Sequence, residues 1–365
     1  MGAALTVPLE VQIEKKLAEF ILDVSFATDD GPLSVLGPSG AGKSMLLRCI
    51  AGLERTDRGR IVLNKRVLLD TEKKLQLPAR ERRIGMLFQH YGLFPHRTLA
   101  ENIAFGIEHL PEEEHQRRVA ALVKRMHISG LENRYPREVS GGEQQRAALA
   151  RALATEPEAL LLDEPLSALD THLRSQMEAE LQDTFDQYAQ PSLLVTHNME
   201  EAYRLGKQLL VLSRGKVAAF GAKDEIFLRP PSVEVARVTG CKNFSRVRPI
   251  DQHSIEAIDW NCRLRATGPV IRQAAHAGIR AHHIRFVDAG GSAPEGENVF
   301  PCWLVRASET PFRTTLYVRL RAPGQSSGEF DLQAEVTRER WEQLRCQSEP
   351  WNVLLPADSI FVVRE

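Results

Sequence analysis

The sequence predicts an α/β domain with a mostly parallel sheet, followed by a smaller all-β domain. Short, continuously apolar runs at residues 33–36, 159–162 and 192–195 alternate with helical segments, as parallel strands buried on both faces do. Beyond Pro230 and Pro231, short strand patterns recur with turn-rich links, which is typical of antiparallel barrels. We expect domains at residues 1–236 and 237–365, with a helical subdomain at about residues 90–155.

Composition and length set the broad class. The chain has 365 residues, 43% hydrophobic and 26% charged, which is typical of a globular protein with two or three domains. The net charge of −1 gives no reason to expect nucleic acid as a partner. The five scattered cysteines contain no Cys-x-x-Cys pair, so a reducing compartment fits best. No apolar run approaches the ~18 residues of a membrane span, so any spans must come from other subunits.

A glycine-rich loop at residues 37–44 matches the phosphate-binding pattern, with a strand pattern before it and a helical pattern after it. Glycines let backbone N–H groups surround a phosphate, and the following helix points its partial positive charge at the same anion. Lys43 is expected to reach the β and γ phosphates of ATP, and Ser44 to bind Mg²⁺. An ordinary glycine-rich turn is the alternative. The loop consists of Gly37, Pro38, Ser39, Gly40, Ala41, Gly42, Lys43 and Ser44.

A second helix start also carries glycines. Ser140 and Glu143 have the spacing of a capping box at the head of a strongly helical run. A cap alone does not explain Gly141 and Gly142, which cost backbone entropy and expose N–H groups. Because residues 37–44 already hold one set of phosphates, this second anion site suggests that two copies of the chain face one another.

Polar residues end three of the predicted strands. Asp163 and Glu164 follow one buried run, Gln89 ends another pattern, and His197 follows a third. Since parallel strands end at one edge, we expect these side chains to gather beside the phosphate loop. Asp163 is placed to hold Mg²⁺, Glu164 to polarise a water molecule, and His197 to contact the γ-phosphate. Structural roles at the strand ends are the alternative.

Two aromatic features have two interpretations each. Phe20 precedes the loop where a nucleotide base could stack on it, but a core phenylalanine on a strand is equally compatible. Residues 91–95 are unusually apolar for a loop, so they either dock a partner or fold onto their own domain.

With these motifs assembled, about the first 235 residues resemble the nucleotide-binding subunit of an ABC transporter. The resemblance makes residues 37–44 the Walker A loop, Gln89 the Q-loop, residues 140–144 the signature motif, residues 160–163 the Walker B strand, Glu164 the catalytic base, residues 167–170 with Asp170 the D-loop, and His197 the switch histidine. Val139 and Glu143 depart mildly from the usual signature. Leu17 is a second candidate for the adenine-stacking position.

The resemblance implies a mechanism and partners. It implies a homodimer that binds ATP and Mg²⁺ between Walker A and signature motifs, with Ser44, Gln89 and Asp163 on the metal. Glu164, His197 and Lys43 would be catalytic. Two transmembrane permease subunits and a periplasmic or extracellular solute-binding protein are expected partners. The chain would then lie on the cytoplasmic face of the cell membrane, as a peripheral subunit.

The tail resembles the TOBE-type barrels of bacterial importer ATPases, which favours an importer. The N-terminus and residues 240–243 resemble molybdate-type subunits, with sulfate or tungstate next and iron, polyamine or sugar importers as wider alternatives. A non-transport ABC ATPase is a rival from another class. A second rival makes the tail an oxyanion sensor through Arg280, His282, His283 and Arg285.

Overall fold

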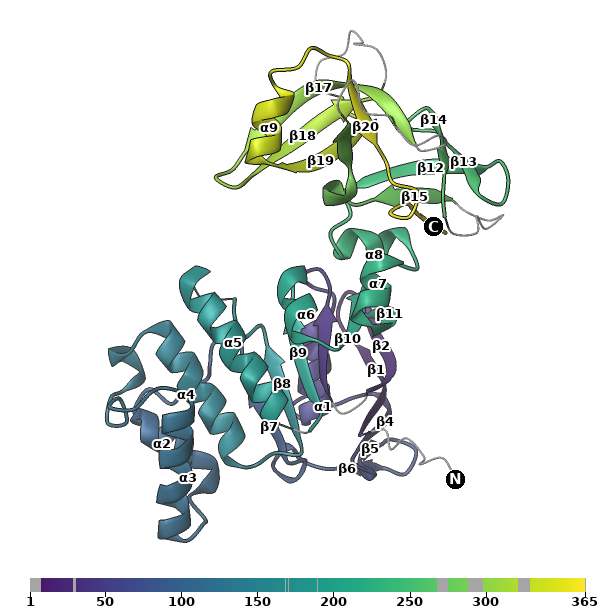
Figure 1. Cartoon of the computed structure of the whole chain (residues 1–365). Coiled ribbons are helices and arrows are strands. Elements are labelled where there is room, and N and C mark those ends of the chain that lie inside the picture. The colour runs from purple at the N-terminus through teal and green to yellow at the C-terminus, as the bar shows by residue number, and fades with distance from the viewer. Residues whose placement is uncertain are drawn as a thin grey trace, which may run out of the picture. The chain divides into compact units, whose positions relative to one another are not determined.

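The computed structural model describes residues 8–28, 31–167, 169, 171–188, 190–267, 275–287, 298–320 and 329–364. The chain forms two compact units, Met1–Lys223 and Asp224–Glu365 (Figure 1). The division lies N-terminal to the expected 236/237 boundary, because helix α8 (Val233–Val238) packs with the second unit. Ala236 and Cys241 share a small core with Phe361 and Val363 from the C-terminal strand. The residues after the paired prolines therefore belong to the β-rich unit.

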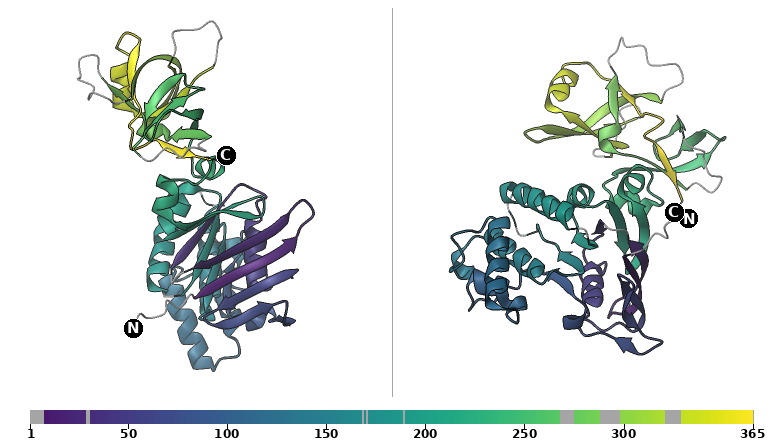
Figure 2. Two further views of the ribbon diagram at one scale, coloured as in Figure 1. Left: turned by 90° about the vertical axis from the view of Figure 1, so that its right-hand side faces the viewer. Right: turned by 60° about the horizontal axis from the view of Figure 1, so that its bottom comes forward.

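One sheet of eleven strands organises the first unit. The five strands at one end of this sheet are all parallel to one another, whereas the N-terminal strands pair in antiparallel fashion and run next to one another in Figure 2. The strand order is β6 (Leu75–Gln76), β5 (Arg66–Asp70), β4 (Arg58–Leu63), β1 (Leu9–Lys16), β2 (Ile21–Thr28), β11 (Lys216–Ala222), β10 (Gln208–Ser213), β3 (Pro32–Leu36), β9 (Ser192–Thr196), β8 (Ala159–Asp163) and β7 (Ile84–Leu87).

The register of the parallel strands brings the predicted polar residues to one edge. Leu36, the last residue of β3, pairs with Thr196 at the end of β9, and Asp163 at the end of β8 pairs with Val195. All residues of these three strands are buried, as their continuously apolar sequences predict for strands covered on both faces. The loop after β3, Glu164 and His197 consequently leave the sheet side by side.

Helices cover this sheet and form the expected helical part. Between β7 and β8 lie α2 (Leu99–Ala104), α3 (Glu112–Arg125) and α4 (Gly141–Ala154), which share one apolar core (Figure 1). The remaining helices of this unit are α1 (Lys43–Ala51), α5 (Thr171–Gln187) and α6 (Met199–Leu205), and α7 (Lys223–Leu228) follows at the boundary. Within the described residues, no helix combines the length and apolar character that a membrane crossing needs.

The second unit is built from two antiparallel sheets around one core, so the predicted all-β character of the tail is confirmed. The first sheet has the order β14 (Cys262–Arg265), β13 (Ser254–Ala257), β12 (Asn243–Pro249), β15 (His276–Ile279) and β21 (Phe361–Val363). The second has the order β16 (Arg285–Val287), β20 (Trp351–Leu354), β17 (Val299–Glu309), β18 (Arg313–Arg319) and β19 (Leu332–Thr337), with α9 (Arg338–Leu344) after it.

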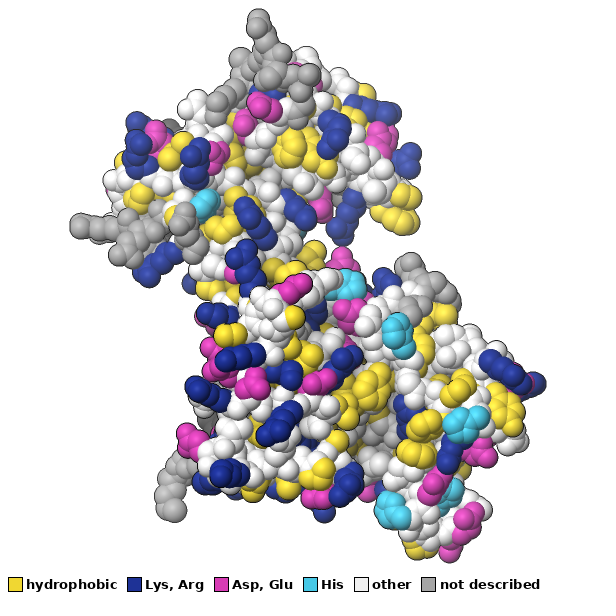
Figure 3. Space-filling view, turned by 180° about the vertical axis from the view of Figure 1, so that it is seen from behind, with side chains coloured by type: hydrophobic (Ala, Val, Ile, Leu, Met, Phe, Trp, Pro, Cys, Tyr) yellow, Lys and Arg dark blue, Asp and Glu magenta, His cyan; other side chains and the backbone are white. Residues whose placement is uncertain are grey.

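The surface carries both signs of charge. Figure 3 shows Lys and Arg side chains interspersed with Asp and Glu on the face of each unit that it presents. This mixture agrees with the overall net charge of −1.

Candidate active site

The loop between β3 and α1 has the backbone that a phosphate cradle requires. Gly40 and Gly42 have φ angles of 79° and 100°, in the left-handed region that glycine adopts without strain. Gly37 is needed for space, because a Cβ there would lie 2.2 Å from the Leu212 carbonyl oxygen. Helix α1 begins at Lys43, directly after Gly42. The loop therefore ends at a helix N-terminus, whose N–H groups and dipole favour an anion.

Lys43 places a buried ammonium group inside this loop. Its side chain is 5% exposed, and Nζ donates to the carbonyl oxygens of Gly37 at 2.8 Å and Pro38 at 3.0 Å. Burial lowers the pKa of Lys43, while the nearby Glu164 and Asp163 carboxylates oppose that shift. A phosphate arriving at the loop would supply further negative charge, which stabilises the charged ammonium.

Ser44 and Asp163 form a pair of oxygen ligands suited to Mg²⁺. The Ser44 hydroxyl donates to Asp163 Oδ1 at 2.8 Å, and Asp163 is 2% exposed. Burial raises the pKa of Asp163, partly offset by the Ser44 hydrogen bond. In the described part of the chain, no cluster of three or more His, Cys, Asp or Glu could hold a metal by itself. This donor set fits Mg²⁺, which commonly binds one or two carboxylates together with substrate phosphates and water.

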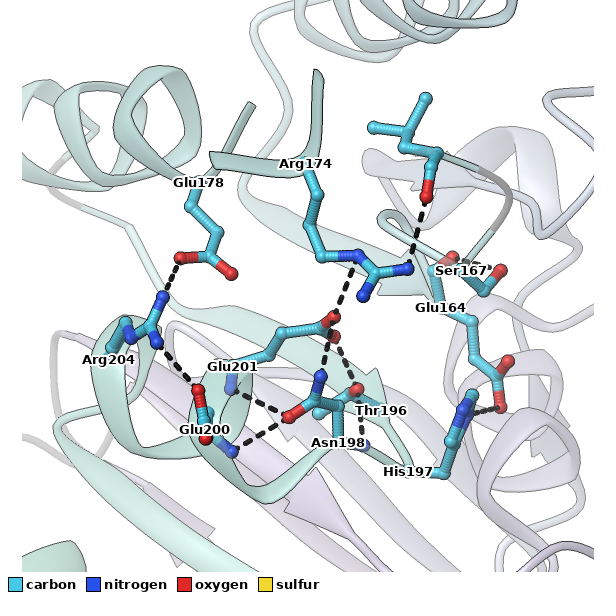
Figure 4. A network of polar contacts seen from close by, with 11 residues as sticks. Glu164, Ser167, Arg174, Glu178, Thr196, His197, Asn198, Glu200, Glu201 and Arg204 are labelled. Carbon is cyan, nitrogen blue, oxygen red and sulfur yellow. Dashed lines mark hydrogen bonds and ion pairs between the residues drawn. The ribbon is translucent and has the colours of Figure 1, made fainter. Parts of the chain in front are cut away.

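Glu164 lies between Gln89 and His197. Gln89 Nε2 is 3.4 Å from Glu164 Oε2. On the other carboxylate oxygen, His197 Nδ1 is 3.2 Å from Glu164 Oε1 (Figure 4). Glu164 has a φ of 47°, and its backbone N–H donates to the Val195 carbonyl at 2.9 Å. The Glu164 side chain is 17% exposed and that of His197 is 56% exposed. Three residues from the ends of β7, β8 and β9 thus meet, as their sequence positions predict.

The second glycine-bearing helix start is a complete cap. Ser140 Oγ and its backbone N–H donate to Glu143 Oε2 at 2.8 and 2.7 Å, and the Glu143 N–H donates back to Ser140 Oγ at 3.4 Å. These hydrogen bonds, the backbone one foremost, lower the pKa of Glu143. Among the described residues, no hydrogen bond or ion pair joins residues 140–143 to the phosphate loop.

Neither glycine of this cap is required by the fold of the chain itself. Gly141 and Gly142 do not have positive φ angles. A Cβ on Gly141 would meet nothing within 4 Å, and one on Gly142 would make only ordinary contact with Leu173 at 3.5 Å. The space in front of Gly141 is therefore open in the single chain. The fold of this chain does not explain why the sequence has glycine there instead of a residue with a side chain.

Other predicted site residues have mixed outcomes. Phe20 is partly buried against the phosphate loop, since a Cβ on Gly42 would lie 3.4 Å from its ring and one on Gly215 would lie 2.5 Å from it. Leu17 is partly buried in the same turn, where its N–H donates to the Phe20 carbonyl at 2.9 Å. Asp170 lies outside the described residues.

The apolar loop at residues 91–95 folds onto its own domain. Arg151 donates to the carbonyl oxygens of Gly92 at 2.7 Å and Tyr91 at 2.8 Å, and Asn102 Oδ1 accepts from the Phe94 N–H at 2.7 Å. The Phe94 ring lies 4.5 Å from that of Phe105, which is 45% exposed. For a docking contact, this leaves the partly exposed rings of Phe94 and Phe105.

Arg280, the centre of the suggested oxyanion sensor, has a local partner set. It is 9% exposed, and its guanidinium donates to the Thr239 hydroxyl at 3.1 Å and to the carbonyl oxygens of Thr239 and Phe227. These bonds hold the chain around α7 and α8 to the β-rich unit. The structure therefore gives Arg280 a structural role.

Sequence reasoning missed the residues that support the site from behind. Arg82 is 1% exposed and donates to the carbonyl oxygens of Cys49 and Ile50 at 2.9 and 2.7 Å, at the end of α1. Glu201 and Arg174 lie behind His197 and are joined to it through Thr196 (Figure 4). Arg82 and Glu201 are distinguished by a buried charge, and burial becomes visible only with the fold; Arg174 is recognised by its contact with Glu201.

Known proteins match this chain over the region that contains the candidate site. The sequence profile of the ABC transporter family matches residues 22–167. The sulfate/thiosulfate import ATP-binding protein of Synechocystis sp. is 43% identical over 225 residues, which cover 60% of this chain and 62% of that relative. The protein of the same name in Nitrosomonas europaea is 34% identical over 335 residues, covering 88% of this chain and 87% of the relative.

The fold has a solved counterpart. A dimeric ATP-binding cassette in a post-hydrolysis state, bound to ADP and Pi, matches with a TM-score of 0.51 and 27% identity. The match covers 59% of this chain and 98% of the cassette. Because the phosphate loop, the cap at Ser140 and the carboxylates all lie in the profile-matched region, and a relative aligns along most of both chains, this chain belongs to the import-type ATPases of the ABC transporter family.

Proposed function

We propose that this chain is the ATP-hydrolysing subunit of an ABC importer for sulfate or a related oxyanion. The observation that carries the catalytic part is the position of Glu164, held between Gln89 and His197 beside the Ser44 and Asp163 pair. A carboxylate at this edge of the sheet can accept a hydrogen bond from a water molecule that faces the terminal phosphate.

The surrounding residues divide the remaining tasks. Residues 37–42 present backbone N–H groups to the phosphates, and Lys43 neutralises the charge that develops as the phosphoryl group departs. His197 lies on the other side of Glu164 and orients its carboxylate. Ser44 and Asp163, with Gln89, would hold Mg²⁺, which would neutralise phosphate charge when bound. Phe20 or Leu17 would contact the adenine.

We propose that two copies enclose each ATP. The open space in front of Gly141, which no part of the described chain fills, supports this arrangement, because a phosphate from a second copy's loop can approach the bare backbone there. The matched cassette structure is dimeric, which also supports it. Closure would then depend on ATP, since only the closed pair satisfies both phosphate-binding surfaces.

The transported solute is proposed from the relatives' names. Residue resemblance alone favours molybdate, but both relatives described above are sulfate/thiosulfate import proteins, so sulfate or thiosulfate takes its place in this proposal. We further propose two permease subunits, a solute-binding protein outside the membrane, and a peripheral position on the cytoplasmic face. The rings of Phe94 and Phe105 are candidates for contact with a permease.

Phosphate release by purified protein tests the catalytic assignment. Glu164→Gln keeps the shape of the side chain but removes the base, and should reduce turnover about 100-fold or more while ATP still binds. Glu200→Gln is the matched control, because Glu200 is exposed and pairs with Arg204 away from the phosphate loop. Hydrolysis by Glu164→Gln at the wild-type rate would remove Glu164 from its role.

The substrate is tested in the complex. The chain is co-purified with its permease partner, placed in lipid vesicles with the solute-binding protein, and supplied with sulfate, thiosulfate, molybdate or maltose. We expect sulfate or thiosulfate to stimulate ATP hydrolysis most strongly. Stimulation by maltose alone would overturn the oxyanion assignment.

A further inference from the structure

Two segments that flank Glu164 are joined behind the active site. One segment follows Glu164 in sequence and includes Ser167, whose hydroxyl donates to the Glu164 carbonyl at 3.0 Å, and Leu169. The other runs from Thr196 to Asn198 and carries His197, which contacts the Glu164 side chain from the opposite side. Figure 4 shows that an arginine and a glutamate stand between the two segments.

Glu201 organises the His197 segment. It is 5% exposed and lies in the first turn of α6. Its Oε2 accepts from the Thr196 hydroxyl at 2.6 Å, and its Oε1 accepts from Asn198 Nδ2 at 3.2 Å. Both neighbours of His197 are therefore bonded to one buried carboxylate.

Arg174 connects this carboxylate to the other segment. From α5, its Nη2 donates to the Leu169 carbonyl at 3.1 Å, and its Nε lies 3.8 Å from Glu201 Oε1. These contacts, together with the chain from Ser167 to Leu169 and from Thr196 to His197, form a closed ring. It runs through Glu164, Ser167, Leu169, Arg174, Glu201, Thr196 and His197 and back to Glu164.

His197 depends on such support because packing does not fix it. Its side chain is 56% exposed, so few neighbours restrict its rotation. Thr196 and Glu201, in contrast, are both buried, which makes their hydrogen bond a rigid attachment point for the backbone next to His197.

We propose that Arg174 and Glu201 are positioning residues that hold His197 against Glu164 and couple its segment to residues 167–169. Neither touches the phosphate loop. Arg174 acts through the Leu169 carbonyl, and Glu201 through the Thr196 hydroxyl and the Asn198 side-chain amide. This inference rests on the proposed ATPase function but concerns a contact between segments, which can be measured without turnover.

The experiment compares Arg174→Ala with Arg204→Ala. Both arginines bridge α5 and α6, but Arg204 pairs with Glu178 at 2.6 Å and Glu200 at 2.7 Å, outside the ring. In the full-length protein, Arg174→Ala should raise amide hydrogen exchange about tenfold at residues 167–169 and also at residues 198–201. Arg204→Ala should leave both segments unchanged.

Steady-state kinetics of the same variants separate positioning from general damage. Arg174→Ala should lower kcat roughly 10- to 100-fold, because small displacements of catalytic groups are costly. The KM for ATP should stay within about twofold, since the phosphate loop is outside the ring. Glu201→Gln keeps an oxygen that accepts from Thr196 but loses the charge pair with Arg174. Its kcat should therefore fall less than that of Arg174→Ala.

A double substitution tests whether the effect passes through His197. In a His197→Ala background, adding Arg174→Ala should change kcat by no more than about twofold, because the group it positions is already absent. Equal losses with and without His197, or unchanged exchange at residues 198–201, would overturn the inference. Coupled exchange in a protein that shows no ATP hydrolysis would instead overturn the proposed function and leave the ring standing.

Discussion

Substitution of Gly141 by alanine separates what the cap needs from what a partner needs. In the single chain the new methyl group meets nothing within 4 Å, and Gly141 does not have the positive φ that alanine would find strained. Because glycine in a helix is less stable than alanine by roughly 0.5–1 kcal/mol, Gly141→Ala should stabilise the isolated protein or leave it unchanged.

The size of this effect is measurable. For a unit of this size, 1 kcal/mol shifts the Tm by about 2–4 °C, so the gain in Tm should not exceed about 4 °C. In the proposed pair the same methyl group would stand between a phosphate and the N–H groups of α4. A loss of about 1.4 kcal/mol or more at that contact weakens ATP-dependent pairing at least about tenfold.

The assay is analytical ultracentrifugation in a Glu164→Gln background, with ATP titrated against Gly141→Ala and unsubstituted protein, alongside thermal unfolding without nucleotide. If Gly141→Ala is as stable as the unsubstituted protein and also dimerises with ATP as tightly, the reasoning is refuted. The open space at Gly141 would then not be where a second copy's phosphate binds.

Three further predictions concern the residues around the phosphate loop. Asp163→Asn should raise the Tm of the nucleotide-free protein at pH 7, because burial raises the pKa of Asp163 and its charged form therefore costs stability. The difference should shrink as the pH falls through the folded pKa toward 3.8, where Asp163 is neutral, and thermal unfolding across pH measures it. The same variant should lose most of the stabilisation by Mg²⁺ and ATP, about 2.7 kcal/mol at a concentration 100-fold above Kd, which melting with and without Mg²⁺ detects. Arg82→Met should lower the free energy of unfolding by about 3 kcal/mol in urea titrations, because the carbonyls of Cys49 and Ile50 lose a buried donor; the exposed Arg80→Met is the control. An unchanged midpoint for Arg82→Met would contradict its capping role.

The sequence was sufficient for the features that depend on local pattern and on parallel topology. Asp163, Glu164 and His197 meet because buried parallel strands end at one edge, and each stands directly after such a strand. The phosphate loop is also readable from local pattern, because Gly40 and Gly42 adopt positive φ angles that other residues rarely adopt, and Gly37 stands where a side chain would not fit.

Features that depend on distant contacts were not predictable. Glu201 reads in sequence as an ordinary acid in the first turn of a helix, and its burial against Thr196 follows only from the position of α6 under β9. In the tail, β12, β15 and β16 have no clear strand pattern in the sequence, because they are short or interrupted by polar residues. The two interpretations of residues 91–95 also required the fold, since only Arg151 and Asn102 show what the loop contacts.

Cross-linking between two singly substituted proteins tests the central claim most directly. Ser39→Cys protein and Ser140→Cys protein, each carrying Glu164→Gln and Cys346→Ser to remove the exposed native thiol, are mixed so that only a link between chains can form. The account predicts a disulfide-linked dimer that accumulates with ATP and Mg²⁺ but not with ADP. Single chains throughout, or linkage that is indifferent to nucleotide, would contradict it.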